Sequence, residues 1–194
     1  GQSLRLQTVS LVSQALGISV VVFYFYGTLS HELVIGWAVA ALLALWGAVH
    51  FRRRFRSDCN REKHVRRWLR AWMLVAVVSG LVWGFAGSAF LAPKNPIDEV
   101  VIVTVIVAIV FASWPVFSCW LPSLTSFTLL ALTPMFFGIA AAYGIGQVFT
   151  CLTLIVITSF VLYSGRRLNE IVVLSVIRNV QNERLVTRLK AEKA

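Results

Sequence analysis

Few residues in this chain could carry out acid–base, nucleophilic or metal chemistry, and their spacing does not gather them. The chain has three histidines, three cysteines and eight acidic residues among its 194 residues. His31 and His50 stand at opposite ends of one apolar run, about 28 Å apart if that run is helical, so they cannot hold one ion together. No two cysteines have CxxC spacing, and no HExxH motif, paired carboxylate or nucleophile–base set occurs. The sequence therefore predicts no catalytic site, no metal site and no cofactor.

The apolar composition indicates what must position the remaining polar residues. Hydrophobic residues make up 58% of the chain, the mean hydropathy is +0.79, and no Asp, Glu, Lys or Arg occurs from Val100 to Gly165. That run of 66 residues is far longer than the ~20 apolar residues that one crossing needs. The runs do not alternate apolar and polar residues, as the strands of a membrane barrel would. The predicted fold class is all-α, a polytopic membrane protein.

Six apolar runs predict six transmembrane helices, separated by breaks rich in glycine, proline or charge. We expect the fourth helix to begin near Ile97 and to pass a kink at Pro115. A tight turn at residues 144–146 joins the fifth run to the sixth. The predicted runs cover residues 6–26, 33–51, 71–91, 100–115, 123–143 and 145–165.

Basic residues are distributed unequally between the loops. Nine lie between residues 52 and 70, and with six crossings Arg5, Arg166 and Arg167 fall on the same side as these nine. The opposite side has one lysine, Lys94, and three acidic residues. Because positively charged loops stay in the cytoplasm, the sequence predicts a membrane protein with both termini cytoplasmic. This asymmetry accounts for the net charge of +10, and we expect no nucleic-acid partner.

A stripe of small residues in the third run is the first candidate site. Gly80 and Gly84 recur at helical spacing, and Trp83 lies beside them near the middle of the run. Small residues with this spacing let two helices approach closely in lipid, so helix packing is the simpler interpretation. Tryptophan, however, usually lies at membrane interfaces. The alternative hypothesis is that Trp83 walls a groove for an apolar ligand.

The other candidate positions lie towards the two membrane faces. We place His31 and Glu32 at the outer mouth of the bundle, and Arg166 and Arg167 as the inner anchor of the last crossing. Trp114 precedes a proline within the fourth crossing, where a kink can act as a hinge. The fourth or fifth helix is therefore expected to shift when a ligand binds, with ordinary interfacial anchoring as the alternative. Since the outer loops are short, a ligand must be recognised within the bilayer or at its outer edge.

A change of composition at Arg166 divides the chain. Residues 1–165 are predicted to be a six-helix transmembrane sensor domain, and residues 166–194 a cytoplasmic linker or signalling helix. No Pro or Gly interrupts the helix from Leu168 onward. Two heptad registers are nearly equal, and each places polar residues at core positions, where they lower stability and can fix register. We expect either a dimeric helix that can switch register or a solvated linker.

Two stretches of this chain form a familiar pattern, namely Arg66-Arg67-Trp68 leading to Ser79-Gly80-Leu81-Val82-Trp83-Gly84, and Arg166-Arg167-Leu168-Asn169-Glu170 continuing to Asn182-Glu183-Arg184-Leu185. They resemble the multipass N-terminal sensor regions of bacterial hybrid histidine kinases and membrane diguanylate cyclases, and this resemblance implies a protein of the bacterial inner membrane. The resemblance implies a signal-transduction protein, such as a two-component sensor, whose last helix enters a kinase or cyclase domain. No phosphoacceptor, GGDEF or ATP-binding motif occurs here, so we expect any enzymatic half outside this chain.

Several functions remain open on the sequence alone. The preferred one is the sensor module of a histidine kinase that receives a small hydrophobic or outer-surface signal, with membrane lipids and a second copy of the chain as partners. The sensor region of a diguanylate cyclase is the first alternative. A transporter or channel subunit predicts a hydrated path and is disfavoured, because the crossings lack ionisable groups along such a path. A structural anchor predicts tightly packed helices without a cavity.

Overall fold

The computed structural model describes residues 2–57, 65–91, 96–118, 120–143 and 148–192, in which six α helices and no strand are present. This arrangement confirms the predicted all-α class. The helices are α1 (Gln2–Phe25), α2 (His31–Ser57), α3 (Val65–Ala89), α4 (Pro96–Phe117), α5 (Leu121–Tyr143) and α6 (Val148–Glu192).

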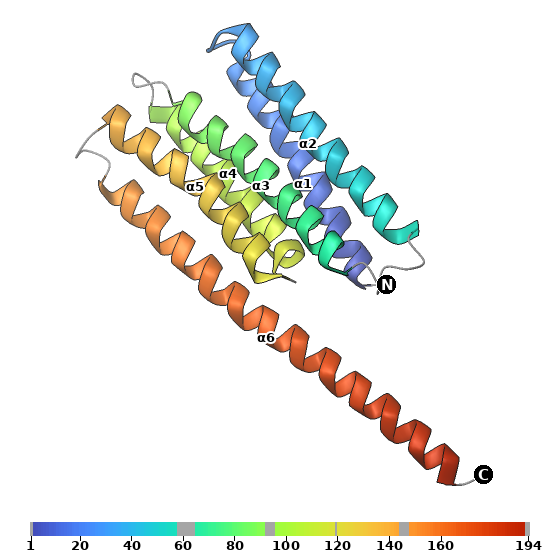
Figure 1. Ribbon diagram of the computed structural model, residues 1–194. Helices are drawn as coiled ribbons and strands as arrows, with labels where there is room; N and C mark the ends of the chain where they lie inside the picture. Colours follow the sequence, from blue (N-terminus) through green and yellow to red (C-terminus); the bar gives the residue numbers. More distant parts are fainter. Residues whose placement is uncertain (1, 58–64, 92–95, 119, 144–147, 193–194) are drawn as a thin grey trace.

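Five of these helices are long and apolar enough to cross a membrane, namely α2 to α6. The first helix differs, because its apolar part is the shorter stretch Ser10–Phe25. α1 nevertheless packs against both α2 and α4 and runs alongside them as a sixth member of the bundle (Figure 1). The chain is therefore a polytopic helical membrane protein.

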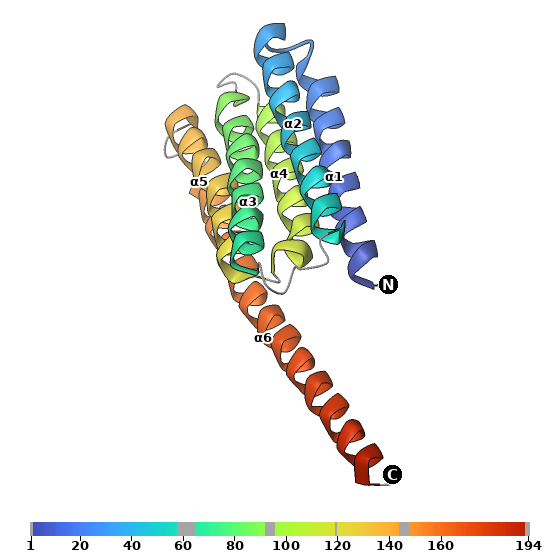
Figure 2. The same ribbon diagram turned by 45° about the vertical axis from the view of Figure 1, so that its right-hand side comes forward.

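The six helices form a bundle in which α3 and α5 make the most extensive contact. α1 and α2 cover one side, and α6 lies on the other side against α5 and, less extensively, α4. Figures 1 and 2 both show the N-terminus at the end of the bundle beyond which α6 projects. Arg52 to Arg54, near the end of α2, and Arg166 and Arg167 on α6 belong to the same end, which we call the basic end.

The helix boundaries follow local signals. α2 begins after Ser30, whose carbonyl oxygen accepts hydrogen bonds from the amides of Leu33 and Val34 at 3.1 and 3.2 Å. α4 begins at Pro96, one residue before the predicted start at Ile97, and contains Pro115 in its last turn. It has two acidic residues in its first turn, where the helix dipole favours negative charge. The turn predicted at residues 144–146 lies outside the described residues.

Close packing of α3 on α5 depends on glycine. A Cβ atom built on Gly84 would overlap the carbonyl oxygen of Leu130, and one built on Gly87 would lie 2.8 Å from Cβ of Met135. Gly138 on α5 lies equally close to α3, since a Cβ atom built on it would lie 3.0 Å from Cα of Ser88. Small residues on both helices therefore bring the two backbones together, as expected for helices that pack in lipid.

Candidate functional site

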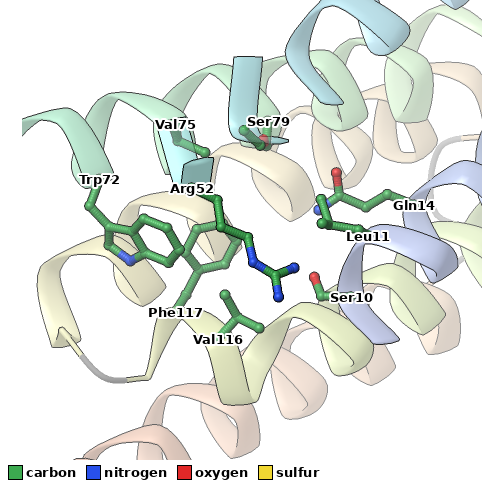
Figure 3. A pocket seen from close by; sticks show the side chains of 10 residues that line it. Ser10, Leu11, Gln14, Arg52, Trp72, Val75, Ser79, Val116 and Phe117 are labelled. Atoms are coloured by element: carbon green, nitrogen blue, oxygen red, sulfur yellow. The ribbon is translucent and has the colours of Figure 1, made fainter. Parts of the chain in front are cut away.

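A pocket lies at the basic end, between α1, α2, α3 and α4 (Figure 3). Its volume is about 40 Å³. Because one water needs about 10–15 Å³ by this measure, the pocket has room for about three water-sized groups. It is lined by Ser10, Leu11, Gln14, Ala48, Arg52, Trp72, Val75, Ser79, Val116 and Phe117.

The polar wall of the pocket comes from α1. Ser10 and Gln14 are one helical turn apart, so they share a face of α1, and both are buried. Both bind the fully buried Ser113 of α4: the two serine Oγ atoms are 3.2 Å apart, and Nε2 of Gln14 donates to Oγ of Ser113 at 3.4 Å. A buried polar group without a partner costs free energy. This cluster therefore fixes the rotation of α1 against α4 and keeps polar atoms at the pocket.

The positive charge of the pocket comes from Arg52. This residue lies near the end of α2 and is half-buried, whereas the next two residues, Arg53 and Arg54, are exposed. Figure 3 shows the guanidinium group of Arg52 directed across the pocket towards Ser10. A guanidinium group stays protonated in proteins and offers five N–H donors in a planar fork. The pocket therefore carries a permanent charge.

The remaining wall is aromatic. The rings of Trp72 on α3 and Phe117 on α4 lie 5.8 Å apart between centroids. Phe51 packs on Trp72 at 5.5 Å, and Phe127 of α5 packs on Phe117 at 4.8 Å. These tilted contacts hold the two rings in place. The pocket thus combines one cationic group and several hydroxyl or amide groups with an apolar surface.

The pocket lies next to the contact between the bundle and α6. Phe117 lines the pocket, and the following residue, Ser118, accepts a hydrogen bond at its carbonyl oxygen from Nδ2 of Asn169, at 3.0 Å. One turn earlier on α6, a Cβ atom at Gly165 would overlap Leu124 of α5 and lie 3.4 Å from Nε1 of Trp114. The end of α4 therefore touches both the pocket and the start of the projecting part of α6.

Gly80 and Gly84, the predicted pocket residues of α3, lie against α5. A Cβ atom at Gly80 would come 2.9 Å from Cβ of Leu130 and 3.0 Å from the carbonyl oxygen of Phe127. Both glycines are buried. At these two positions the structure favours the packing interpretation, since main chain fills the space next to the stripe.

Trp83 is 2% exposed and lies in the interior between α1, α2 and α4. Its ring packs against Trp37 of α2 with centroids 5.3 Å apart, and a Cβ atom built on Gly17 of α1 would meet both the far edge of this ring and the side chain of Ile109 of α4. Nε1 of Trp37 donates to the carbonyl oxygen of Val82 at 2.9 Å. This tryptophan pair is part of the core and does not line the pocket.

His31 and Glu32 lie at the opposite end of the bundle from the pocket. Both are exposed, and His31 packs edge-on against Tyr26 at 4.5 Å. His31 and Arg52 are separated by about 32 Å along α2. At that end the hydroxyl of Tyr24 also donates to Oδ1 of the buried Asp98 at 2.9 Å. The structure therefore does not bring His31 and Glu32 together with Gly80, Trp83 or Gly84.

Trp114, the last predicted site residue, lies between α4 and α6. Its ring packs against Phe111 at 6.2 Å and against Phe160 of α6 at 6.1 Å. Its Nε1 is buried and has no hydrogen-bond partner among the described residues. Below it, Arg167 packs over the ring of Tyr163 at 5.9 Å, on the exposed side of α6. Trp114 therefore belongs to the α4–α6 contact and not to the lining of the pocket.

Sequence reasoning missed the residues that line the pocket. Ser10 and Gln14 stand at i and i+4 among several polar residues in the first half of the run, and this spacing is a signal for one polar face turned towards other helices. Arg52 was interpreted only as part of the basic loop that sets topology. The missing information was that α2 packs against α1 and α3, so that the side chain of Arg52 reaches a pocket that residues of α4 also line.

The described residues contain no group of three or more His, Cys, Asp and Glu side chains able to hold a metal ion. Comparisons with protein-family models, with curated proteins and with solved structures found no match to this chain.

Proposed function

We propose that this chain is the signal-receiving module of a bacterial sensor histidine kinase, in which α6 carries the state of the membrane bundle to a cytoplasmic output domain. The observation that carries the proposal is the hydrogen bond between Asn169 of α6 and the carbonyl oxygen of Ser118, next to the pocket. α6 is one helix of 45 residues, about 68 Å long. It continues without a break from the bundle to far beyond the basic end (Figure 2).

The mechanism requires two packings of the bundle with different affinity for a ligand, because a ligand shifts an equilibrium only by that difference. Phe117 is part of the pocket wall, and Ser118 holds α6. A ligand that moves the end of α4 therefore acts on α6 at a defined point. A kinase and a diguanylate cyclase domain would receive this movement in the same way.

The orientation follows from charge. Arg52 to Arg54 and Arg166 and Arg167 belong to the basic end, and by the positive-inside rule this charge supports an orientation with that end in the cytoplasm of a bacterial inner-membrane protein. Beyond the bundle, Ile171 and Leu174 are 62% and 53% exposed. Exposed apolar side chains on a helix that projects from the bundle favour contact with a second helix, and both occupy core positions of one heptad register. This arrangement supports a homodimer formed through α6.

The test uses the full-length gene product in membrane vesicles, assayed for autophosphorylation and for cyclic diguanylate synthesis. Asn169→Ala removes a hydrogen bond of about 0.5–1.5 kcal/mol. Basal output should therefore change by about 2–12-fold in an equilibrium between two packings. Ser175→Ala is the matched control, because Ser175 is exposed on α6 beyond the bundle. Equal output from both variants, or a gene product with neither activity, would contradict the proposal.

A further inference from the structure

We propose that the pocket at the basic end binds the carboxylate headgroup of a single-chain amphiphile, such as a long-chain fatty acid, from the adjoining membrane leaflet. The inference deepens the proposed function by naming a ligand class, and its signalling consequence rests on that function. The binding itself is argued from the pocket alone.

The donors of the pocket match an oxyanion. Arg52 directs its planar guanidinium group across the pocket (Figure 3), and this group pairs with a carboxylate through two parallel N–H···O bonds. Ser10 and Ser79 add buried hydroxyl groups, and Gln14 has a second N–H besides the one that it donates to Ser113.

The size of the pocket favours a carboxylate over a phospholipid headgroup. About 40 Å³ holds about three water-sized groups. A carboxylate has three heavy atoms, whereas a phosphodiester with its glycerol substituents has several times as many. The pocket therefore accepts the headgroup of a fatty acid but not that of a phosphatidylglycerol.

The position of the pocket suits a ligand that is held at the membrane surface. Arg52 follows the apolar part of α2 and opens the run of arginines, so it lies where the hydrocarbon gives way to water. Trp72, Phe117 and Val116 provide apolar surface on the same pocket, which is only partly enclosed. An acyl chain can leave along these side chains into the hydrocarbon while its carboxylate stays at the level of Arg52.

The test labels the purified full-length protein in nanodiscs with a photoreactive palmitate and maps the labelled residues by mass spectrometry. We expect the label near Leu11 and Val116, and we expect unlabelled palmitate to displace it. Arg52→Gln should lower labelling by at least about tenfold, because it removes a charge-assisted pair. Arg53→Gln, which changes the exposed neighbouring arginine, should leave labelling unchanged.

Other outcomes would overturn the inference. Displacement of the probe by hexadecanol or by phosphatidylglycerol as effectively as by palmitate would contradict recognition of a carboxylate of this size. Displacement by acetate alone would contradict the need for an acyl chain, and equal loss in the Arg52 and Arg53 variants would show a nonspecific charge effect.

Folding and function are checked separately. Thermal unfolding establishes whether each variant is folded. Val116→Trp fills the pocket with a larger side chain and leaves Arg52 in place. A folded Val116→Trp protein that is labelled as strongly as the unchanged protein also contradicts the inference. If palmitate binds but does not change the output activity, the receptor function fails and the binding site stands. If Asn169→Ala changes the output activity but palmitate does not bind in the pocket, the binding site fails and the receptor function stands.

Discussion

Replacing Gly84 with alanine should push α5 away from α3 and destabilise the bundle. The new Cβ atom would overlap the carbonyl oxygen of Leu130 and lie 3.0 Å from Cγ of Pro134. At Gly80, it would lie 3.0 Å from the carbonyl oxygen of Phe127. An ordinary carbon–oxygen contact is about 3.3–3.6 Å. Gly80→Ala therefore requires a shift of a few tenths of an ångström. Gly84→Ala requires a larger shift, because the group that it meets is the main chain of α5 at Leu130, which cannot rotate away as a side chain can.

The magnitude follows from two opposing effects. Overpacking a well-packed interface destabilises the folded protein by about 1–3 kcal/mol. Replacing glycine with alanine within a helix stabilises it by about 0.5–1 kcal/mol. We expect Gly84→Ala to lower the free energy of unfolding by about 1–2 kcal/mol and Gly80→Ala by less than about 1 kcal/mol. Gly36 and Gly47 on α2 are the matched controls, because no atom lies within 4 Å of their added Cβ atoms. Their alanine variants should be unchanged or slightly stabilised.

The assay is reversible unfolding of the purified protein in bicelles, followed by circular dichroism or by steric trapping. The order of stability should be Gly36→Ala, then Gly80→Ala, then Gly84→Ala. A Gly84→Ala protein as stable as Gly36→Ala would refute the close approach of α3 and α5. It would also revive the alternative that the glycine stripe borders an open groove.

Three further predictions use the same unfolding assay. Trp37→Phe removes a buried hydrogen bond and should cost about 1 kcal/mol, whereas Trp46→Phe on the same helix, at a side chain 66% exposed, should cost little. Thr128→Val should be neutral or stabilising, since its buried hydroxyl has no partner among the described residues; a loss above about 1 kcal/mol would contradict this reasoning. Tyr24→Phe should destabilise the protein, because it removes a hydrogen bond to a buried carboxylate, Asp98, and an unchanged free energy would show that this contact contributes nothing.

The helices of this protein could be predicted because charge and proline interrupt its apolar runs at intervals close to one bilayer thickness. The pairing of helices could not. In lipid, buried and lipid-facing surfaces are both apolar, so hydrophobicity does not separate them. Trp37 and Trp46 illustrate the difficulty: both lie in the apolar part of α2, yet one is 4% and the other 66% exposed.

The surroundings of the candidate site residues depend on helix pairing, which the sequence does not reveal. Small-residue spacing predicts that the glycines of α3 pack against a helix, and in the structure that helix is α5. The position of Trp83 near the middle of a crossing suggests a groove for an apolar ligand. In the structure, the ring of Trp37 packs against Trp83 instead. Arg52 is one of three consecutive arginines, and nothing in the sequence distinguishes it from Arg53. The structure does, because Arg52 is half-buried at the pocket and Arg53 is exposed.

The hydrogen bond at Asn169 divides α6 into two nearly equal arms, one beside α5 and one beyond the bundle. From Asn169 to Glu192 the outer arm measures about 35 Å. If the rod stays straight, tilting it by only ~5° about that bond would carry its tip sideways by about 3 Å, given this arm length. Because the two arms are nearly equal, such a tilt moves the tip by about as much as it moves the other end of α6, so a displacement inside the bundle reaches a distant helix pair without loss.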